Sequence, residues 1–115
     1  MSAQSTSLLT VAVTAVGAIA AARFTTPAGA QAGADANTLG VSRFSAVAGE
    51  KITLDVLGTA VVEAGAVVAA GATVKSDASG RAIPWVASGA KVGLALDAAT
   101  AAGQMIEVLL VPNVA

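Results

Sequence analysis

Hydrophobic and polar residues alternate with a period of two near the N-terminus. Positions 11, 13 and 15 alternate with positions 12, 14 and 16, and β-branched residues dominate until Gly17 interrupts the pattern. This pattern predicts a strand over residues 11–16. A second strand is expected from about residue 18 to residue 25, where Pro27 ends it, and the two strands are predicted to pair with each other.

The uncharged stretch at residues 8–22 superficially resembles the apolar part of a signal peptide. No Lys or Arg precedes it, Arg23 follows it, and it is shorter than the roughly 20 residues that cross a bilayer. We therefore expect strands in this stretch, neither a leader nor a spanning helix, and no membrane partner.

Two later stretches, at residues 39–57 and 92–111, share one pattern. In each, a short alternating run is followed by an Ala-Gly turn and a second alternating run. The recurrence predicts a pseudo-symmetric sandwich or barrel, with two hairpins that are candidates to pair with each other. The alternative is that hairpins with an Ala-Gly turn look alike in any alanine-rich chain. The corresponding residues are Gly40 and Gly93, Gly49 and Gly103, Ile52 and Ile106, and Leu54 and Val108.

The remaining segments are short and rich in glycine. Residues 27–37 are small and nearly uncharged, which predicts a surface loop. Recurrent glycines split residues 58–85 into short strands, and Asp77 with Gly80 predicts a type I turn that joins residues 73–75 to residues 81–83. These patterns together predict an all-β fold, a compact β-sandwich or partly open β-barrel of short strands with little helix. We expect a single β domain at residues 11–115, preceded by an N-terminal arm at residues 1–10.

The composition argues against an enzyme. The chain has no His, Cys or Tyr, and general acid–base and nucleophilic catalysis near neutral pH usually recruit His or Cys. Its isolated carboxylates lack the ligand spacing of a calcium loop, so we expect neither a metal site nor a cofactor. A net charge of −1 gives no positive field for a phosphate backbone, and nucleic acid is not an expected partner.

Four polar or aromatic residues are candidates for specific contacts with another molecule. Arg23, Arg43 and Arg81 can hold carboxylates bidentately across subunits, although solvated arginines are the plainer interpretation. Trp85 is the only tryptophan, and it either packs on the core or anchors an interface. These residues are the candidate subunit or partner contacts of the folded domain.

The predicted arm supplies two further candidates, Leu8 and Leu9. An apolar, uncharged arm can add a strand to the edge of a partner's sheet, and the alternative is a disordered tail that contributes nothing. Phe24 and Phe44, by contrast, lie in alternating runs and are expected in the core.

Glycine and alanine motifs recur along most of the chain from about residue 18 onward. They lie at residues 40–42, 48–50, 58–65, 70–71, 75–82, 93–96 and 102–109. In this order they resemble the small capsid decoration, or cement, proteins of tailed bacteriophages.

The resemblance implies a structural virion protein that decorates the outer surface of a phage capsid. It implies a β-rich domain that cements neighbouring subunits of the major capsid protein and stabilises the DNA-filled head. It also implies a homotrimer at three-fold or quasi-three-fold positions, made in the cytoplasm of the bacterial host.

A rival interpretation is a non-enzymatic carrier or binding module. The closely spaced glycines of residues 62–74 are similar to the hairpins of biotinyl and lipoyl domains, which need an exposed Lys at a hairpin tip. Lys51 is the residue that could occupy such a turn, although its neighbours do not resemble the usual modified site. An unmodified mass after expression with the ligases would remove this alternative.

Overall fold

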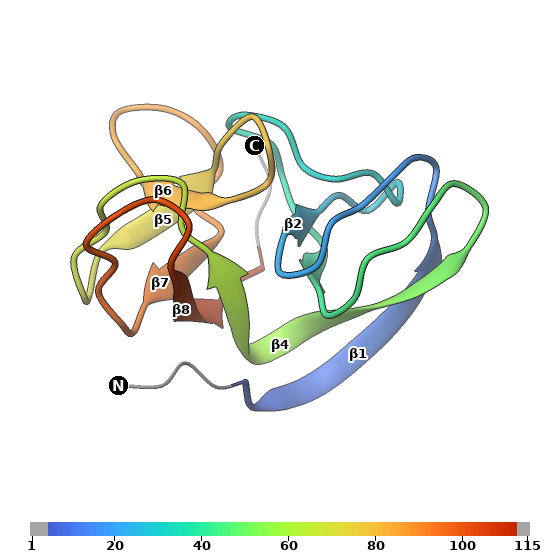
Figure 1. Cartoon of the computed structure of the whole chain (residues 1–115). Coiled ribbons are helices and arrows are strands. Elements are labelled where there is room, and N and C mark those ends of the chain that lie inside the picture. The colour runs from blue at the N-terminus through green and yellow to red at the C-terminus, as the bar shows by residue number, and fades with distance from the viewer. Residues whose placement is uncertain (1–4, 113–115) are drawn as a thin grey trace.

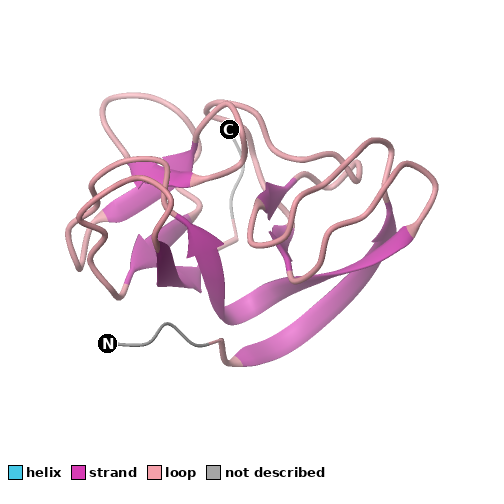
Figure 2. Ribbon diagram, in the orientation of Figure 1, coloured by secondary structure: helices cyan, strands magenta, loops and turns pink. Residues whose placement is uncertain are grey.

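The structure is a computed structural model that describes residues 5–112, and in this part of the chain all regular structure is β-strand (Figures 1 and 2). The predicted all-β class is confirmed. The eight strands are β1 (Ser7–Thr14), β2 (Phe24–Thr25), β3 (Gly40–Ser42), β4 (Lys51–Glu63), β5 (Thr73–Ser76), β6 (Ala82–Pro84), β7 (Gly93–Ala95) and β8 (Met105–Leu110).

The strands form one antiparallel sheet that curls into a nearly closed, barrel-like shape. The strand order is β2-β3-β4-β8-β7-β5-β6, and β1 pairs with β4 beside this path. Most of the strands are short, as the recurrent glycines predict, whereas β4 has 13 residues and runs from one lobe of the molecule to the other (Figure 1).

The long strand β4 changes partners and direction near its middle. Its first half pairs with β1 and β3, and its second half pairs with β8. Gly58 separates the two halves and has a φ of 95°, a backbone conformation that residues with a side chain rarely adopt. A Cβ atom at this position would meet the carbonyl oxygen of Thr6. Glycine therefore permits both the bend and the close approach of the N-terminal segment.

The two predicted hairpins form, and they have the same register. In the first, Ser42 of β3 pairs with Leu54 of β4, and in the second, Ala95 of β7 pairs with Val108 of β8. These are the residues that the sequence repeat aligns with each other. The hairpins do not pair with each other, because β4 continues past the first hairpin and its second half takes β8 as partner.

The repeat extends well beyond the two hairpins. The pairing of Val13 with Ile52, between β1 and β4, corresponds to the pairing of Val62 with Ile106, between β4 and β8. The other equivalent pairs are Phe24 with Val41 and Thr73 with Leu94, and Ile19 with Ala46 and Val68 with Ala99. The chain is therefore two copies of one unit, at about residues 7–57 and 59–110, and β4 supplies the last strand of the first and the first strand of the second.

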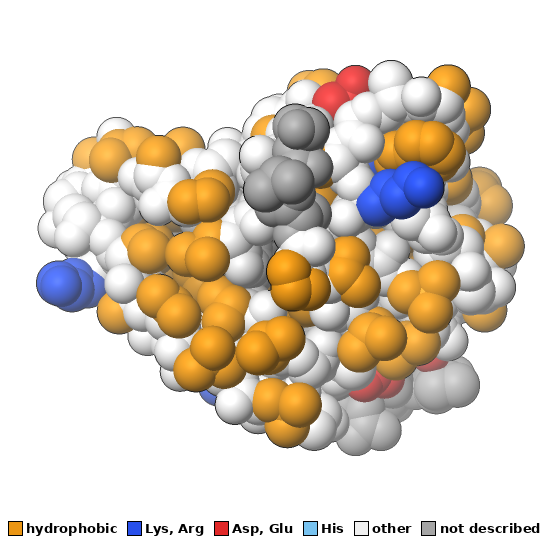
Figure 3. Space-filling view, turned by 180° about the vertical axis from the view of Figure 1, so that it is seen from behind, with side chains coloured by type: hydrophobic (Ala, Val, Ile, Leu, Met, Phe, Trp, Pro, Cys, Tyr) orange, Lys and Arg blue, Asp and Glu red, His pale blue; other side chains and the backbone are white. Residues whose placement is uncertain are grey.

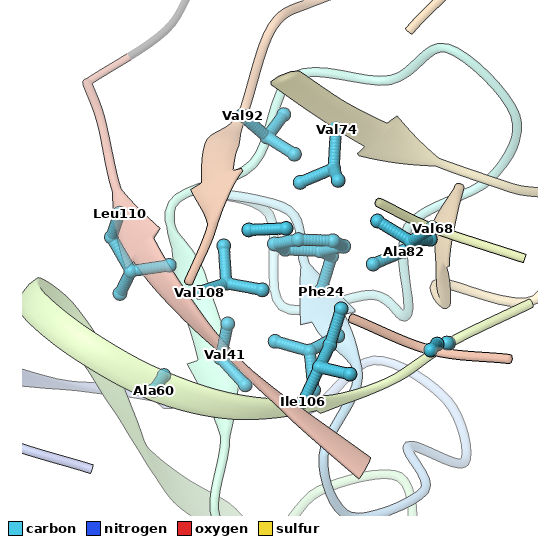
Figure 4. Packing of buried hydrophobic residues seen from close by; sticks show 14 of the residues in the cluster. Phe24, Val41, Ala60, Val68, Val74, Ala82, Val92, Ile106, Val108 and Leu110 are labelled. Atoms are coloured by element: carbon cyan, nitrogen blue, oxygen red, sulfur yellow. The ribbon is translucent and has the colours of Figure 1, made fainter. Parts of the chain in front are cut away.

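Two hydrophobic clusters fill the interior. The smaller lies in the first unit and consists of Ala15, Ile19, Ala46, Ile52 and Leu54. The larger lies mainly in the second unit, but Phe24 and Val41 of the first unit belong to it. Phe24 is fully buried at its centre (Figure 4). The two units therefore share part of their core.

The predicted pairing of residues 11–16 with residues 18–25 is wrong. β1 pairs with β4 instead, and β2 pairs with β3. The second stretch is not one strand, because Ile19 forms a single bridge to Ala46 and Ala22 has a φ of 59°, which breaks an extended strand. The pattern identified β1 correctly but could not identify its partner, which lies about 40 residues further along the chain.

The prediction for Phe44 is also wrong. Phe24 is buried, as predicted, but the side chain of Phe44 is 70% exposed. β3 ends at Ser42, so Phe44 lies in the turn that follows and is outside the alternation of the strand. The predicted loop at residues 27–37 contains no strand, and the predicted turn forms with a hydrogen bond from the amide of Gly80 to the carbonyl of Asp77.

Candidate interaction surface

The most exposed hydrophobic side chain in the described strands is that of Leu8 in β1. Leu8 is 77% exposed and Leu9 is 48% exposed, and Leu9 pairs with Leu57 of β4, which is also exposed. We call Leu8, Leu9, Val11 and Leu57 the β1 patch. Apolar side chains that no part of the described chain covers are typical of surfaces that bind another protein.

Further large hydrophobic side chains are exposed in the loops. They are Val16, Phe44, Val47, Val67, Val86, Leu96 and Val111. Hydrophobic side chains spread over much of the face in Figure 3, with few charged side chains among them. Phe44 could not be recognised as a surface residue from the sequence, because nothing in the local pattern shows that β3 stops two residues before it.

Two of the candidate arginines meet at one carboxylate. Arg23 Nη2 lies 3.2 Å from Glu63 Oε1, and Arg81 Nη1 lies 3.5 Å from Glu63 Oε2. Arg23 also donates to the carbonyl of Ser79, and Arg81 contacts Asp77 at 3.1 Å. All four charged side chains are largely buried, and they join the first unit to the second.

The third candidate arginine forms a separate pair. Arg43 Nε donates to both carboxylate oxygens of Asp55, at 2.8 and 3.0 Å. The Asp55 side chain is 2% exposed, whereas that of Arg43 is 42% exposed. The hydrogen bond to Asp55 and its charge raise the pKa of Arg43 above its ordinary value. Arg43 thus neutralises a buried carboxylate and remains accessible at the surface.

Trp85 follows β6 and stabilises the loop after it. Its indole N–H donates to the carbonyl of Gly89 at 2.9 Å, and Lys91 Nζ lies 4.4 Å from the centre of the ring, within the range of a cation–π contact. Trp85 is half-buried and belongs to neither core cluster. Its ring is therefore partly available to another molecule.

The structure brings some of the candidates together and separates others. Leu8 and Leu9 share the β1 patch, and Arg23 and Arg81 share Glu63, while Arg43 and Trp85 each have contacts of their own. Residues 1–4 of the predicted arm lie outside the described residues. The remainder of the arm includes the first part of β1, which pairs with β4.

Residues 5–112 contain no group of three acidic side chains placed to hold a metal ion. The same part of the chain has no helix that is long and apolar enough to cross a membrane.

The barrel-like fold and the exposed apolar side chains agree with the comparisons, which define a structural, capsid-associated phage protein. The model of the phage cement protein family matches residues 3–110, and the chain belongs to this family. The match favours the capsid interpretation over the carrier interpretation.

A solved structure supports the same fold. The chain is similar to the N base of the head fiber gp8.5 of bacteriophage phi29, with a TM-score of 0.73 and 18% sequence identity. The similarity covers 90% of this chain and 93% of that chain. A search of curated proteins returns no match.

Proposed function

We propose that this protein binds the outer surface of a phage capsid and cements neighbouring subunits of the major capsid protein. The match of the cement family over residues 3–110 carries the proposal. The similarity to the N base of the phi29 head fiber supports a position outside the shell. The protein would be made in the cytoplasm of the bacterial host before it attaches to the head.

In this proposal the protein acts by binding alone. A chain without His and Cys offers few groups for catalysis near neutral pH, and its weak net charge allows many copies to lie close together on one shell. Contacts that symmetry repeats over a capsid need little free energy each. We propose homotrimers at three-fold positions, with neither nucleic acid nor a membrane as partner and without a cofactor.

The β1 patch is the proposed capsid contact, and Trp85 and Arg43 are proposed to add contacts at the rim. Leu8 and Leu9 expose more apolar surface than a strand residue normally does, and binding would remove that surface from water. Arg23 and Arg81 both form ion pairs with Glu63 inside the fold. We therefore propose that their main role is to stabilise the fold, and that any contact at the rim is secondary. In the predicted arm, the part that lies in β1 would make the contact with the capsid.

Co-sedimentation with capsids tests the proposed contact. A Leu8→Ser, Leu9→Ser variant keeps the backbone pairing of β1 with β4 but removes most of the apolar surface, and we expect binding to mature heads to weaken at least tenfold. The matched control is Val67→Ser, which changes a side chain that is 63% exposed in a loop of the second unit. Equal binding by the leucine variant, the control and the natural protein would refute the β1 patch as the contact.

A further inference from the structure

One edge of β4 has a gap in its backbone pairing. The amide of Thr59 donates to the carbonyl of Thr6 at 2.9 Å. Further along the strand, the amide of Glu63 donates to the carbonyl of Ala22 at 3.0 Å. Val61 lies midway between them, and its amide points to the same side, away from β8, because alternate residues of an antiparallel strand direct their amides the same way. Within residues 5–112, no strand pairs with β4 on this side of Val61, and its amide has no hydrogen-bond partner.

The gap opens into a hollow of about 280 Å³. The N-terminal segment, the turn at Ala22 and the strand β4 all contribute to its lining. A water molecule takes about 30 Å³ of the liquid, so the hollow has room for a side chain of another molecule. We call it the Arg43 hollow, and its lining includes Ser5, Ala22, Arg43, Asp55, Val61 and Met105.

Arg43 has hydrogen-bond donors that the fold does not use. Its Nε donates to Asp55 at 2.8 and 3.0 Å, whereas no hydrogen bond within residues 5–112 involves its Nη1 or Nη2. A guanidinium group carries its N–H donors in a planar fork, and four of the five are on these two atoms. The bond to the nearly buried Asp55 also holds the fork in place, so little side-chain entropy is lost when a partner binds.

The donors around the hollow favour a negatively charged acceptor. The Val61 amide and the Arg43 terminal nitrogens are both donors, and hydrogen bonds from a guanidinium to a carboxylate are stronger than those between neutral groups. Asp55 is the only carboxylate of the lining, and it is bound at Nε, which leaves the terminal nitrogens for a second carboxylate. Met105 is 50% exposed and offers an apolar contact to the methylene groups of an acidic side chain.

The hollow adjoins the β1 patch. Ser5 contributes to its lining, and β1 begins two residues later and carries Leu8 and Leu9. On β4, Leu57 of the patch precedes Val61 by one turn of the alternation on either side of the bend. One partner surface can therefore cover the β1 patch and reach the hollow.

We propose that the Arg43 hollow binds an acidic side chain of the major capsid protein. The carboxylate of this Asp or Glu accepts hydrogen bonds from the Val61 amide and from Nη1 and Nη2 of Arg43. The proposal rests on the proposed function, which places the β1 patch against the capsid, and it names the chemistry of the capsid residue that Arg43 contacts.

Two substitutions of Ser5 test the charge of the occupant. Ser5 is exposed, and Ser5→Asp and Ser5→Asn introduce side chains of nearly the same size. Only Ser5→Asp adds a carboxylate, which repels a capsid carboxylate and competes for the donors of Arg43. We expect Ser5→Asp to weaken co-sedimentation with mature heads about tenfold and Ser5→Asn to weaken it less than about twofold, with equal thermal unfolding midpoints. Equal binding by the two variants would overturn the proposal.

A Ser5→Lys variant identifies the molecule that supplies the carboxylate. It leaves the pair of Arg43 with Asp55 intact and places an amine beside the hollow. A carbodiimide joins an amine to a carboxylate in contact with it, with loss of water. On heads that carry the variant, we expect an amide bond from the new amine to an Asp or Glu of the major capsid protein, identified by mass spectrometry of the digest. The matched control is Val67→Lys, at a side chain that is 63% exposed in a loop of the second unit.

The outcomes separate this proposal from the proposed function. An amide bond from Ser5→Lys to a second copy of this chain would place the hollow between copies and overturn the proposal. A yield no higher than that of Val67→Lys would also overturn it, because a backbone carbonyl or an amide side chain in the hollow cannot react. Heads that fail to bind the natural protein would refute the proposed function itself, whereas failure of the Ser5 tests with intact binding refutes only the carboxylate contact.

Discussion

Phe24 and Phe44 are the two phenylalanines of the chain, and their environments are opposite. Phe24 is fully buried in the larger cluster, whereas the side chain of Phe44 is 70% exposed. Most of the surrounding cluster consists of Ala and Val, so few large side chains could close around a cavity at position 24. A small core of this kind depends strongly on its single aromatic residue.

We expect Phe24→Ala to lower the free energy of unfolding by about 3–5 kcal/mol, through lost apolar contact and the cavity that remains. The matched substitution Phe44→Ala should change it by less than about 0.5 kcal/mol, because an exposed side chain loses little contact. Urea denaturation followed by circular dichroism measures both. Similar losses for the two variants would contradict the burial described for Phe24.

Glu63 is the residue at which the two units are joined by charge. Its carboxylate accepts from Arg23 and lies beside Arg81, and its side chain is 19% exposed. Loss of the charge would leave Arg23 without a counter-ion and Arg81 with Asp77 alone, in a poorly hydrated site, which costs more than the loss of a surface ion pair.

We expect Glu63→Gln to lower the free energy of unfolding by about 1–3 kcal/mol. The control is Glu107→Gln, an equal change of charge at a side chain for which the described residues form no ion pair. High salt should reduce the difference in the free energy of unfolding between the two variants only slightly, since the Glu63 ion pairs are shielded from solvent. Equal stability of the two variants would show that the Glu63 cluster does not stabilise the fold.

At the scale of the strands, the repeat places two glycines at equivalent crossings. Gly40 of β3 lies against the carbonyl of Asp55, and Gly93 of β7 lies against that of Leu109. Asp55 and Leu109 are themselves equivalent in the two units. Both positions therefore require glycine for the same reason, because the backbone of the neighbouring strand leaves no room for a Cβ atom.

Alanine at either position should destabilise the fold by a similar amount, about 1–3 kcal/mol, since the added methyl group would collide with fixed backbone. Gly17→Ala is the control, because a Cβ atom at that glycine meets nothing within 4 Å. Its stability should be unchanged or slightly higher. Thermal unfolding of the three variants measures these differences in stability. A strong loss of stability at only one of Gly40 and Gly93 would argue against equivalent units.

The hairpins could be predicted because their information is local: alternation, an Ala-Gly turn and alternation again within about 20 residues. The partner of β1 could not be predicted in this way, since alternation marks a strand but not its neighbour. The same limit applies to Glu63, whose partner Arg23 is 40 positions away in sequence. The sequence shows that the candidate arginines can bind carboxylates. It does not show that Arg23 and Arg81 bind a carboxylate of their own chain, because that depends on the long-range topology.

At the scale of the whole molecule, β4 and Phe24 make the two units interdependent. β4 contributes a strand to each unit, and Phe24 from the first unit lies in the larger cluster, most of which belongs to the second. We therefore expect a single cooperative unfolding transition, with coincident curves from circular dichroism and Trp85 fluorescence. Two separate transitions would show that the units fold independently.

The function proposed for this member of the phage cement family is to bind the outside of the capsid. Electron cryomicroscopy tests it most directly, with mature heads of the virus that encodes the chain, prepared without this protein and imaged before and after its addition. We expect new density on the outer surface, repeated at three-fold or quasi-three-fold positions and large enough for a barrel with extents of 35 × 29 × 23 Å per copy. Heads that show no added density at saturating protein, or density only inside the shell, would contradict it.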